Sequence, residues 1–149
     1  MSIDKEINQK YFTNEFQKST INLIYTYNWI NEKMKEILDK FQITSQQFNI
    51  LRILRGSGEP LSTLQIRQRM LDKMSDTSRI VDRMIIKGLV KKVVRLTDKR
   101  LVDVTLAEKG ERLLEKMDEF QDEMDSILKN LSEDEARTLN RLLDKIRNA

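Results

Sequence analysis

The hydrophobic residues along most of this chain follow the three-and-four spacing of an amphipathic α-helix. The longest such pattern runs from Phe16 to Phe41 and predicts one long helix, which the flanking residues allow to begin as early as Glu6. A second long pattern runs from Leu113 to Leu131, after Gly110, and predicts another continuous helix. With one proline and four glycines in 149 residues, the chain has few breaks, so its elements should be long.

Three capping boxes mark the start of the other helices. In a capping box a Ser or Thr side chain accepts a hydrogen bond from the backbone three residues later, and a Gln or Glu there bonds back. Residues 44–47 (TSQQ) open a helix that ends in the Gly/Ser/Pro stretch at 56–60. Residues 62–65 (STLQ) open a short helix that reaches Met70, and residues 132–135 (SEDE) open the last helix.

A further short helix is expected between Ser75, its predicted N-cap, and Gly88, which is a common residue after a helix end. Its aliphatic residues share one face and its charged residues share roughly the opposite face. The predicted buried residues are Ile80, Val81, Met84 and Ile85, and the predicted exposed ones are Asp76, Arg79, Arg83 and Lys87.

Residues 89–106 change from helical to strand spacing. An apolar and basic strand over 89–96 is followed by a charged turn at 97–100 and by alternation that begins at Leu101, which predicts a β-hairpin. The predicted fold is therefore mainly α with a small β-hairpin, in the order long helix, three short helices, hairpin, long helix, helix. This order describes a winged helix–turn–helix flanked by long helices, within a single domain of residues 1–149.

Positive charge is concentrated in the middle of the chain. Residues 61–100 contain 11 Lys and Arg and 4 Asp and Glu, a net charge of +7, whereas residues 1–60 carry +1 and residues 101–149 carry −5. A localised basic surface is typical of proteins that bind a polyanion. A basic face that is merely solvated is the alternative, and charge by itself leaves both open.

The composition argues against most enzymes and metal proteins. The chain contains no cysteine and no histidine, so disulfides, thiol nucleophiles, the usual neutral-pH acid–base group and the commonest zinc ligand are all excluded. No nucleophile–base pair, metal-ligand set or phosphate-binding glycine loop stands out. We therefore expect no enzymatic activity and no cofactor. No apolar run resembles a signal peptide or a membrane span, so a cytoplasmic location without membrane association is expected.

The predicted third short helix and hairpin carry residue types that suit double-stranded DNA. Short side chains at the helix start let its backbone approach bases and phosphates, arginine pairs bidentately with guanine or phosphate, and Asp98 in the turn would orient Arg100. The candidate DNA-contacting residues are Ser75, Asp76, Thr77, Ser78, Arg79, Arg83, Arg95, Lys99 and Arg100. Each has a simpler interpretation, namely helix capping, a solvated charge or an Asx turn.

Together these residues resemble the MarR (multiple antibiotic resistance regulator) family of bacterial transcription factors. The resemblance rests on SDTSRIVDRMIIKGLVKK at 75–92, DKR at 98–100 and VTLAEKG at 104–110, and with the flanking helices it covers essentially the whole chain. In the last motif Ala107 replaces the family's hydroxyl, so the next helix loses its usual cap, and Thr105 is a possible substitute. Lysines at 91 and 92 stand where the family often has arginine.

The resemblance implies a homodimer that binds a pseudo-palindromic DNA site through a winged helix–turn–helix at 44–106, with dimerisation helices at 1–41 and 107–149. Apolar residues near both ends support a partner independently, because leaving them in water costs about 1.5–3 kcal/mol per large side chain. The candidate interface residues are Ile7, Tyr11, Phe12, Phe16, Leu128, Leu131, Leu139, Leu142, Leu143 and Ile146. The alternative is that both ends pack within one chain.

The resemblance also implies a function and a class of effector. Regulators of this family often bind small aromatic or anionic ligands between the dimer helices and the winged module. Tyr25, Trp29 and Phe48 are candidates to line such a cleft, although all three also suit a hydrophobic core. We expect a sequence-specific DNA-binding transcriptional regulator, a ligand-responsive repressor. A winged-helix module whose basic face docks an acidic protein is the alternative.

Overall fold

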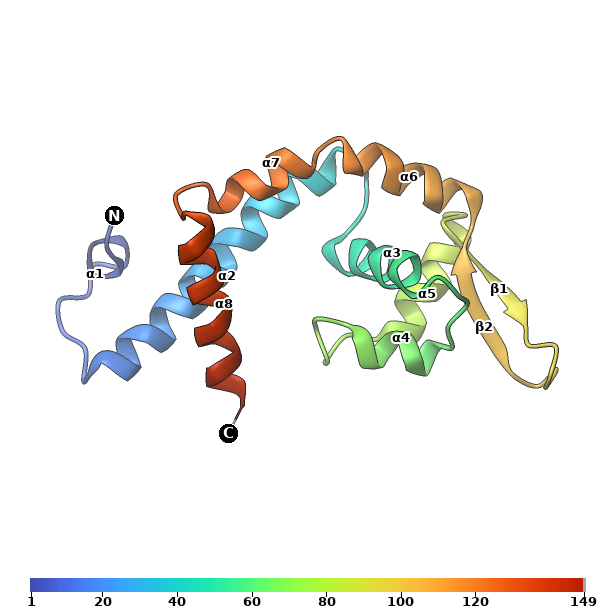
Figure 1. The fold of residues 1–149 in the computed structure, drawn as a ribbon, viewed down its shortest axis with the longest axis horizontal. Coiled ribbons are helices and arrows are strands. Elements are labelled where there is room, and N and C mark those ends of the chain that lie inside the picture. Colours follow the sequence, from blue (N-terminus) through green and yellow to red (C-terminus); the bar gives the residue numbers. More distant parts are fainter. Residues whose placement is uncertain (149) are drawn as a thin grey trace.

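A winged helix–turn–helix lies at one end of the molecule and helical arms extend from it, in a computed structural model that describes residues 1–148 (Figure 1). The two strands form an antiparallel hairpin, so the predicted fold class is confirmed. The elements are α1 (Ile3–Glu6), α2 (Glu15–Asp39), α3 (Ser45–Ser57), α4 (Thr63–Arg69), α5 (Thr77–Ile86), β1 (Val90–Val94), β2 (Val102–Leu106), α6 (Glu108–Asp118), α7 (Gln121–Asp125), a 3-10 turn (Ser126–Leu128) and α8 (Glu133–Arg147).

All three predicted capping boxes are formed. At the start of α3 the backbone N–H of Gln47 donates to Thr44 Oγ1, and the N–H of Thr44 donates back to Gln47 Oε1, both at 3.1 Å. The same reciprocal bonds open α4 at Ser62 and α8 at Ser132. These bonds satisfy backbone donors that a helix start leaves unpaired, which is why the sequence signal was reliable.

The long first helix begins at Glu15 and not at Glu6. Asn14 caps it by accepting a hydrogen bond from the backbone N–H of Gln17 at 2.8 Å. Upstream, Asn8 adopts a left-handed φ of 51°, and the chain between α1 and α2 is not helical. The local bonds of Asn14 therefore override the apolar spacing that continues before it.

The second long helix predicted after Gly110 is also broken. The helix α6 ends at Asp118, and after a turn the chain continues as α7 and a 3-10 turn. At this break the ring of Phe120 packs edge-on against Phe41, with centroids 5.1 Å apart and planes at 89°. Helical spacing persists through the bend because Phe120 still faces the end of α2, so the pattern did not reveal the interruption.

The hydrophobic core lies in the winged module and receives side chains from both arms. Leu38 at the end of α2 and Leu114 and Met117 of α6 join buried residues of α3, α4, α5 and the hairpin. The fully buried members with the largest side chains are Leu38, Ile50, Leu51, Leu61, Ile66, Met84, Leu114, Val81, Val90 and Val104. The arms are thereby tied to the module that they carry.

The hairpin is anchored at its base and projects freely at its tip. Val90 pairs with Leu106 and Val94 with Val102, and Val104 also exchanges two backbone hydrogen bonds with Leu61 at 3.0 and 2.7 Å. Towards the tip, Val94 and Val102 are exposed. This hairpin is therefore a wing that is held at its base, by the first residues of β1 and the last residues of β2.

The helix α6 follows the wing at very close range. Its N-cap is Ala107, which makes no side-chain capping bond, and Thr105 lies within β2, so the suggested substitute cap is wrong. The backbone N–H of Ala107 instead donates to the carbonyl of Leu89 at 3.0 Å. A Cβ atom on Gly110 would lie 2.2 Å from that same carbonyl oxygen, so only glycine fits there.

Within residues 1–148, every helix is too short or too polar to cross a membrane.

Replacing Gly110 with alanine should strongly destabilise the fold, by about 3 kcal/mol, because its Cβ would collide with the Leu89 carbonyl. Chemical denaturation monitored by circular dichroism measures this. The matched control is Gly56→Ala in α3, where a Cβ meets nothing within 4 Å. That change should stabilise the chain by about 0.5–1 kcal/mol. Equal effects at the two positions would contradict the packing described here.

Candidate nucleic-acid interface

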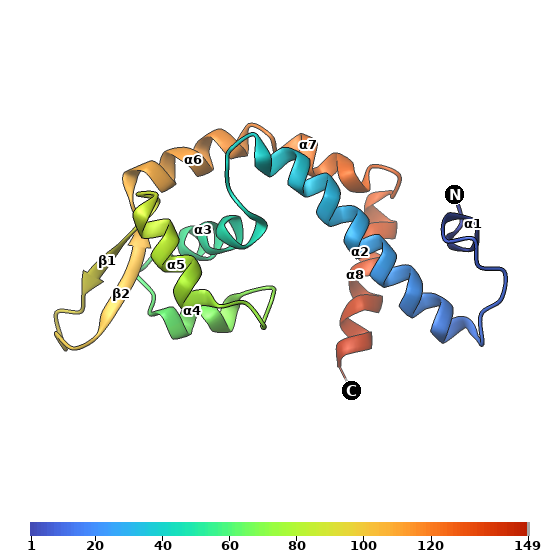
Figure 2. The same cartoon turned by 180° about the vertical axis from the view of Figure 1, so that it is seen from behind.

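The helix α5 divides cleanly into a buried and an exposed face. Thr77, Ile80, Val81 and Met84 are buried against the module core. On the other side the exposed residues are Ser78, Arg79, Asp82, Arg83 and Ile86. Seen from behind, α5 runs from the base of the wing past α3 and down to α4 (Figure 2). The exposed face of α5 and the wing thus belong to one end of the winged module.

The N-cap of α5 is Asp76 and not Ser75. The backbone N–H of Arg79 donates to Asp76 Oδ1 at 3.2 Å, whereas Ser75 Oγ donates to the Asp72 carbonyl at 2.8 Å in the preceding turn. A carboxylate is a strong acceptor and also interacts favourably with the positive end of the helix dipole. The helix start therefore carries its own negative charge.

Thr77 does not belong to the exposed surface. Thr77 is only 3% exposed, and its Oγ1 atom is buried without a hydrogen-bond partner among the described residues. The burial of Thr77 therefore contradicts the prediction that its side chain is exposed at the DNA-contacting face. The cause is the helix start, because beginning at Thr77 turns this residue inward next to Ile80 and Val81.

The two arginines of α5 differ in their surroundings. The Nε atom of Arg79 lies 3.7 Å from Asp76 Oδ2, and both side chains are largely exposed. Arg83 is exposed one turn further along and enters no ion pair within residues 1–148. Arg83 thus presents an unneutralised charge, whereas Asp76 orients Arg79 and partly offsets its charge.

Arg95 is bound to the wing itself. Its Nε and Nη2 atoms donate to the two carboxylate oxygens of Asp103 at 3.1 and 2.7 Å, which gives a bidentate ion pair across the hairpin. The Asp103 side chain is only 13% exposed, and the Arg95 guanidinium holds the pKa of that carboxyl below its usual range. Arg95 was predicted to contact DNA, but this geometry makes it a brace of the wing.

At the wing tip Asp98 contacts Arg100, as the sequence suggested. Asp98 accepts hydrogen bonds from the Arg100 backbone N–H, Nε and Nη2 at 3.1, 3.1 and 3.2 Å. The same carboxylate therefore forms an Asx turn and an ion pair, and the ion pair lowers its pKa. The Arg100 side chain remains 90% exposed and Lys99 is exposed beside it.

Sequence reasoning missed residues of α4 and of the wing that share this end of the module. Arg67 and Leu64 line a shallow hollow together with Met74 and the first residues of α5. Leu96 at the wing tip is almost fully exposed. The basic character of residues 61–100 included Arg67, but only the tertiary structure brings α4 beside the start of α5.

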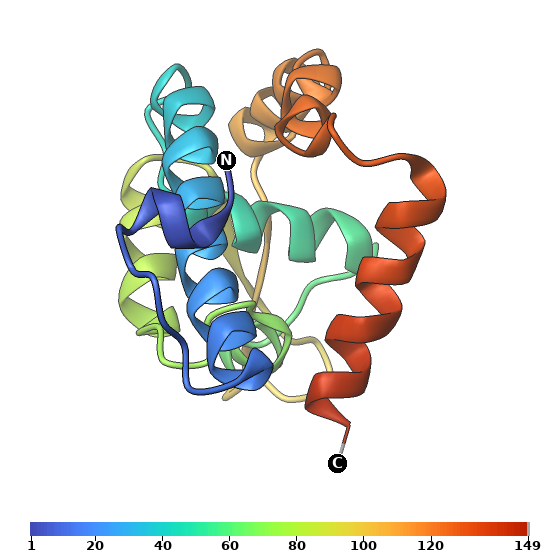
Figure 3. The same cartoon turned by 90° about the vertical axis from the view of Figure 1, so that its left-hand side faces the viewer.

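The arms expose the apolar residues that were expected at a dimer interface. Tyr11, Phe16, Leu128, Leu142 and Ile146 are exposed. The other candidates are half-buried, namely Ile7, Phe12, Leu131, Leu139 and Leu143. Among its described residues α8 buries none, and it stands apart from α2 (Figure 3). Packing within one chain therefore leaves the apolar face of α8 uncovered.

The three candidate ligand-cleft residues do not come together. Tyr25 and Trp29 line a hollow between α1 and α2, where the Tyr25 hydroxyl donates to Glu6 Oε2 at 3.0 Å and its pKa is raised by that bond. Phe48 lies in α3, packs against the module core and contacts the Arg52 guanidinium. The shared cleft that was predicted is therefore not formed within the described chain.

The Arg95–Asp103 pair should make wing stability depend on pH. Because the pKa of Asp103 is lowered in the folded wing, its contribution is present above the unfolded value near 4 and is lost as pH falls through the folded value. Asp103→Asn should therefore weaken wing protection in hydrogen exchange at neutral pH and lose this difference in strong acid. Asp122→Asn, an exposed change on α7, serves as the control. A pH-independent difference would contradict the assignment.

Comparison with known proteins supplies the family. No family model matches the chain. The multiple antibiotic resistance protein MarR of Salmonella typhimurium is 30% identical over 127 residues, which cover 83% of this chain and 88% of that protein. The HTH-type transcriptional repressor IacR of Pseudomonas putida is 30% identical over 116 residues, 77% of this chain and 69% of that protein.

Solved structures have the same fold. A mutant of Escherichia coli MarR complexed with operator DNA superposes with a TM-score of 0.80 at 24% identity and covers 92% of this chain and 99% of its own. Bordetella bronchiseptica BpsR, whose DNA binding is regulated by 6-hydroxynicotinic acid, gives 0.79 at 23% identity, with coverage of 94% and 99%. The winged module, the helical arms and the relatives together show that the chain belongs to the MarR family of winged helix–turn–helix transcriptional regulators.

Proposed function

We propose that this chain is a ligand-responsive repressor that binds a pseudo-palindromic double-stranded DNA operator as a homodimer, in the cytoplasm. The observation that carries the proposal is the set of exposed cations on α5 and on the wing tip. The helix α5 exposes Arg79 and Arg83, and the wing that follows it in the chain exposes Lys99 and Arg100 at its tip. An exposed helix and an adjacent hairpin of this kind fit the major groove and the neighbouring backbone.

The two cationic elements have different tasks in this proposal. Arg83 and Arg79 would enter the major groove, where arginine pairs bidentately with guanine or holds a phosphate. Arg100 and Lys99 would reach the adjacent minor groove or its phosphates. The carboxylate of Asp98 fixes two nitrogens of Arg100, which reduces the conformational entropy that this long side chain loses on binding.

Asp76 gives this interface a chemical preference. Its carboxylate occupies the helix start, where a phosphate would otherwise meet the free N–H groups of α5. Repulsion between the carboxylate and phosphates disfavours a close backbone contact at that point. An exposed aspartate near base edges can accept a hydrogen bond from the cytosine amino group instead. Asp76 therefore favours sequence reading over simple phosphate binding.

The arms supply the dimer. Exposed apolar residues on α2 and α8 need a cover, and a second copy of the same chain provides an identical set related by a two-fold axis. In a dimer of this type the two α5 helices lie about 34 Å apart, one turn of B-DNA. The proposed division assigns residues 44–106 to DNA binding and residues 1–41 and 107–149 to dimerisation, with Leu114 of α6 completing the core of the winged module.

Two relatives support the regulatory part of the proposal. IacR is named a transcriptional repressor, and the DNA binding of BpsR is regulated by 6-hydroxynicotinic acid. We extend to this chain the use of a small aromatic or anionic effector that alters operator affinity. An effector does so only by binding the DNA-competent and the DNA-incompetent arrangements with different affinities.

Replacing arginines of α5 and of the wing should have different effects on DNA binding. Arg83→Ala should weaken the free energy of binding to a selected operator by about 1–3 kcal/mol, because it removes a base or groove contact. The loss on a random duplex should be smaller. Arg100→Ala should weaken binding to both duplexes more evenly. Fluorescence anisotropy with a duplex selected from random sequences measures both. Lys35→Ala, on the arm helix α2, is the control and should leave affinity unchanged.

Salt dependence separates this function from docking of an acidic protein. On DNA, log K should fall by about 0.9 per log unit of salt for each phosphate neutralised. A protein that shows no duplex preference and little affinity at moderate salt would refute the operator proposal and favour the alternative of a protein-docking module.

Placing a charge in the apolar face of α8 should dissociate the dimer. Leu142→Asp with Ile146→Asp puts two carboxylates where the partner should cover exposed apolar side chains, so sedimentation velocity should show a monomer. Leu64→Asp, an equally exposed position on α4, should leave the dimer intact. An unchanged dimer in the α8 variant would show that α8 does not form the interface.

A further inference from the structure

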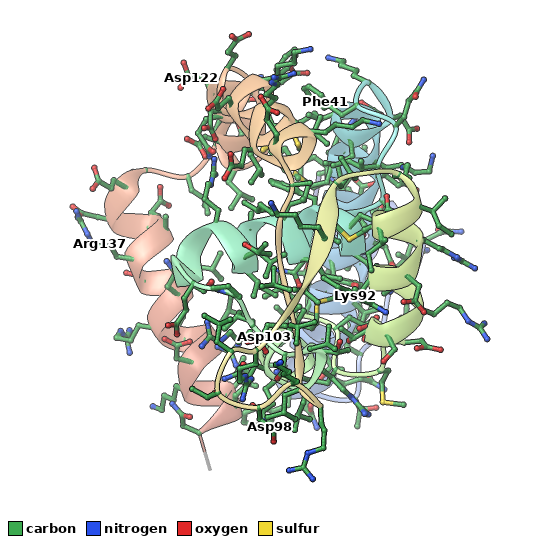
Figure 4. All side chains as sticks on the ribbon, turned by 90° about the vertical axis from the view of Figure 1, so that its right-hand side faces the viewer. Phe41, Lys92, Asp98, Asp103, Asp122 and Arg137 are labelled. Atoms are coloured by element: carbon green, nitrogen blue, oxygen red, sulfur yellow. The ribbon has the colours of Figure 1, made fainter. Side chains whose placement is uncertain are left out.

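A hollow of about 470 Å³ lies between α4 and the start of α5. Its lining residues are Thr63, Leu64 and Arg67 of α4, Met74 and Ser75 of the connection, and Asp76, Thr77 and Ser78 of the α5 start. In Figures 1 and 2, α4 and the wing tip lie at the same lower end of the winged module. Figure 4 places Asp98 of that tip at the opposite end of the molecule from Phe41, which follows α2. The hollow therefore lies at the end of the module that bears the proposed DNA-contacting residues.

Two large apolar side chains are exposed at this hollow. Leu64 is 63% exposed and Met74 is 92% exposed. Leu64 points outward because Ile66, two positions along α4, fills the core, and side chains two positions apart on a helix diverge by about 200°. Their exposure leaves apolar surface in water unless a partner covers it.

Exposure by itself does not mark a contact site. Single apolar residues are common on protein surfaces, and Leu71 in the same connection is 78% exposed without lining the hollow. Leu64 and Met74 differ from Leu71 because they line one hollow together with the first residues of α5. In the proposed function, that part of α5 enters the major groove.

The polar residues of the hollow suit a base edge better than a phosphate. Asp76 Oδ1 accepts the backbone N–H of Arg79 at 3.2 Å, and its carboxylate repels phosphate oxygens. Ser78 is exposed and short, so it allows a close approach to the start of α5. Arg67 is exposed on α4, where it can hold a phosphate that flanks the base. The hollow thus combines a cation for the backbone with an apolar wall for the base.

Thymine is the base that matches an apolar wall. In the major groove its 5-methyl group is the apolar feature of the base edges, whereas the other bases present hydrogen-bond donors and acceptors. Leucine and methionine side chains cannot replace the water that such donors and acceptors lose, but they gain by covering a methyl group. Methionine is also unbranched and polarizable, so Met74 can adapt to the position of that group.

We infer that Leu64 and Met74 form a site for the 5-methyl group of a thymine in each operator half-site. This inference rests on the proposed function, because it assigns a base preference to the same DNA-contacting surface. It adds residues of α4 and of the connection to the reading done by α5. A two-fold dimer carries two such hollows, so one thymine in each half-site would be read.

Deoxyuridine tests the inference, because it lacks only the 5-methyl group of thymidine and keeps its base pairing. Each thymine of a duplex selected from random sequences is replaced in turn, symmetrically in both half-sites. Fluorescence anisotropy with the full-length protein measures the affinity. At one position per half-site the replacement should weaken binding about fifteenfold, which is about fourfold for each methyl group. A selected duplex in which no replacement changes the affinity would overturn the inference.

Alanine variants connect that position with the two side chains. The double variant Leu64→Ala, Met74→Ala should bind the thymine duplex at least about fifteenfold more weakly and lose nothing further when deoxyuridine stands at that position. Leu71→Ala is the matched control and should keep the affinity and the deoxyuridine profile of the wild-type protein. Circular dichroism verifies that each variant is folded. A double variant that keeps the full deoxyuridine penalty would show that the methyl group acts elsewhere, or through DNA shape.

The same titrations separate this inference from the proposed function. A wild-type protein without preference for any duplex sequence would refute the operator proposal and the thymine site with it. Preferential binding to a selected duplex, combined with equal deoxyuridine penalties in the wild-type protein and the double variant, would refute the thymine site alone.

Discussion

Ile80, Val81 and Met84 are buried together in the core, and their burial sets the orientation of α5 about its own axis. Rotating the helix would expose them, at a cost of about 1.5–3 kcal/mol for each large side chain. The opposite face, with Arg79 and Arg83, is therefore directed outward by packing and not by its own chemistry. The wing has a related origin, because β1 follows α5 directly and is anchored at Val90. One packed helix face thus positions both cationic elements.

Carboxylates next to the arginines offset part of the positive charge of this surface and fix the arginine side chains. Asp76, Asp98 and Asp103 each contact one arginine. The net charge of +7 over residues 61–100 already counts Asp76 and Asp98, but Asp103 lies outside that segment and offsets one more positive charge, that of Arg95. The pairs are not equivalent. Asp103 is largely buried and braces the wing, whereas Asp98 lies at an exposed tip and orients a side chain that remains accessible. Each carboxylate lowers the positive charge of the surface but fixes the position of the arginine that it contacts. This arrangement favours selective over nonspecific binding.

The helix α6 leads from the wing into the arm that contains α7 and α8 (Figure 1). Gly110 brings it against the Leu89 carbonyl, and Leu114 enters the core of the winged module. Together with Leu38 of α2, these contacts join the arms to the winged module. The close approach at Gly110 packs α6 directly against the backbone that precedes β1.

Local signals in the sequence determined the helix starts at Thr44, Ser62 and Ser132, the hairpin and the basic middle segment, because each depends on residues only a few positions apart or on composition. The ordered motifs from Ser75 to Gly110 were sufficient to indicate the family. Tertiary structure alone decided the break at Phe120, which depends on Phe41, and the burial of Thr77, which depends on where α5 begins. It also paired Arg95 with Asp103. Contacts between residues distant in the chain leave no periodic trace, because the spacing of side chains records which face is apolar and not what covers it.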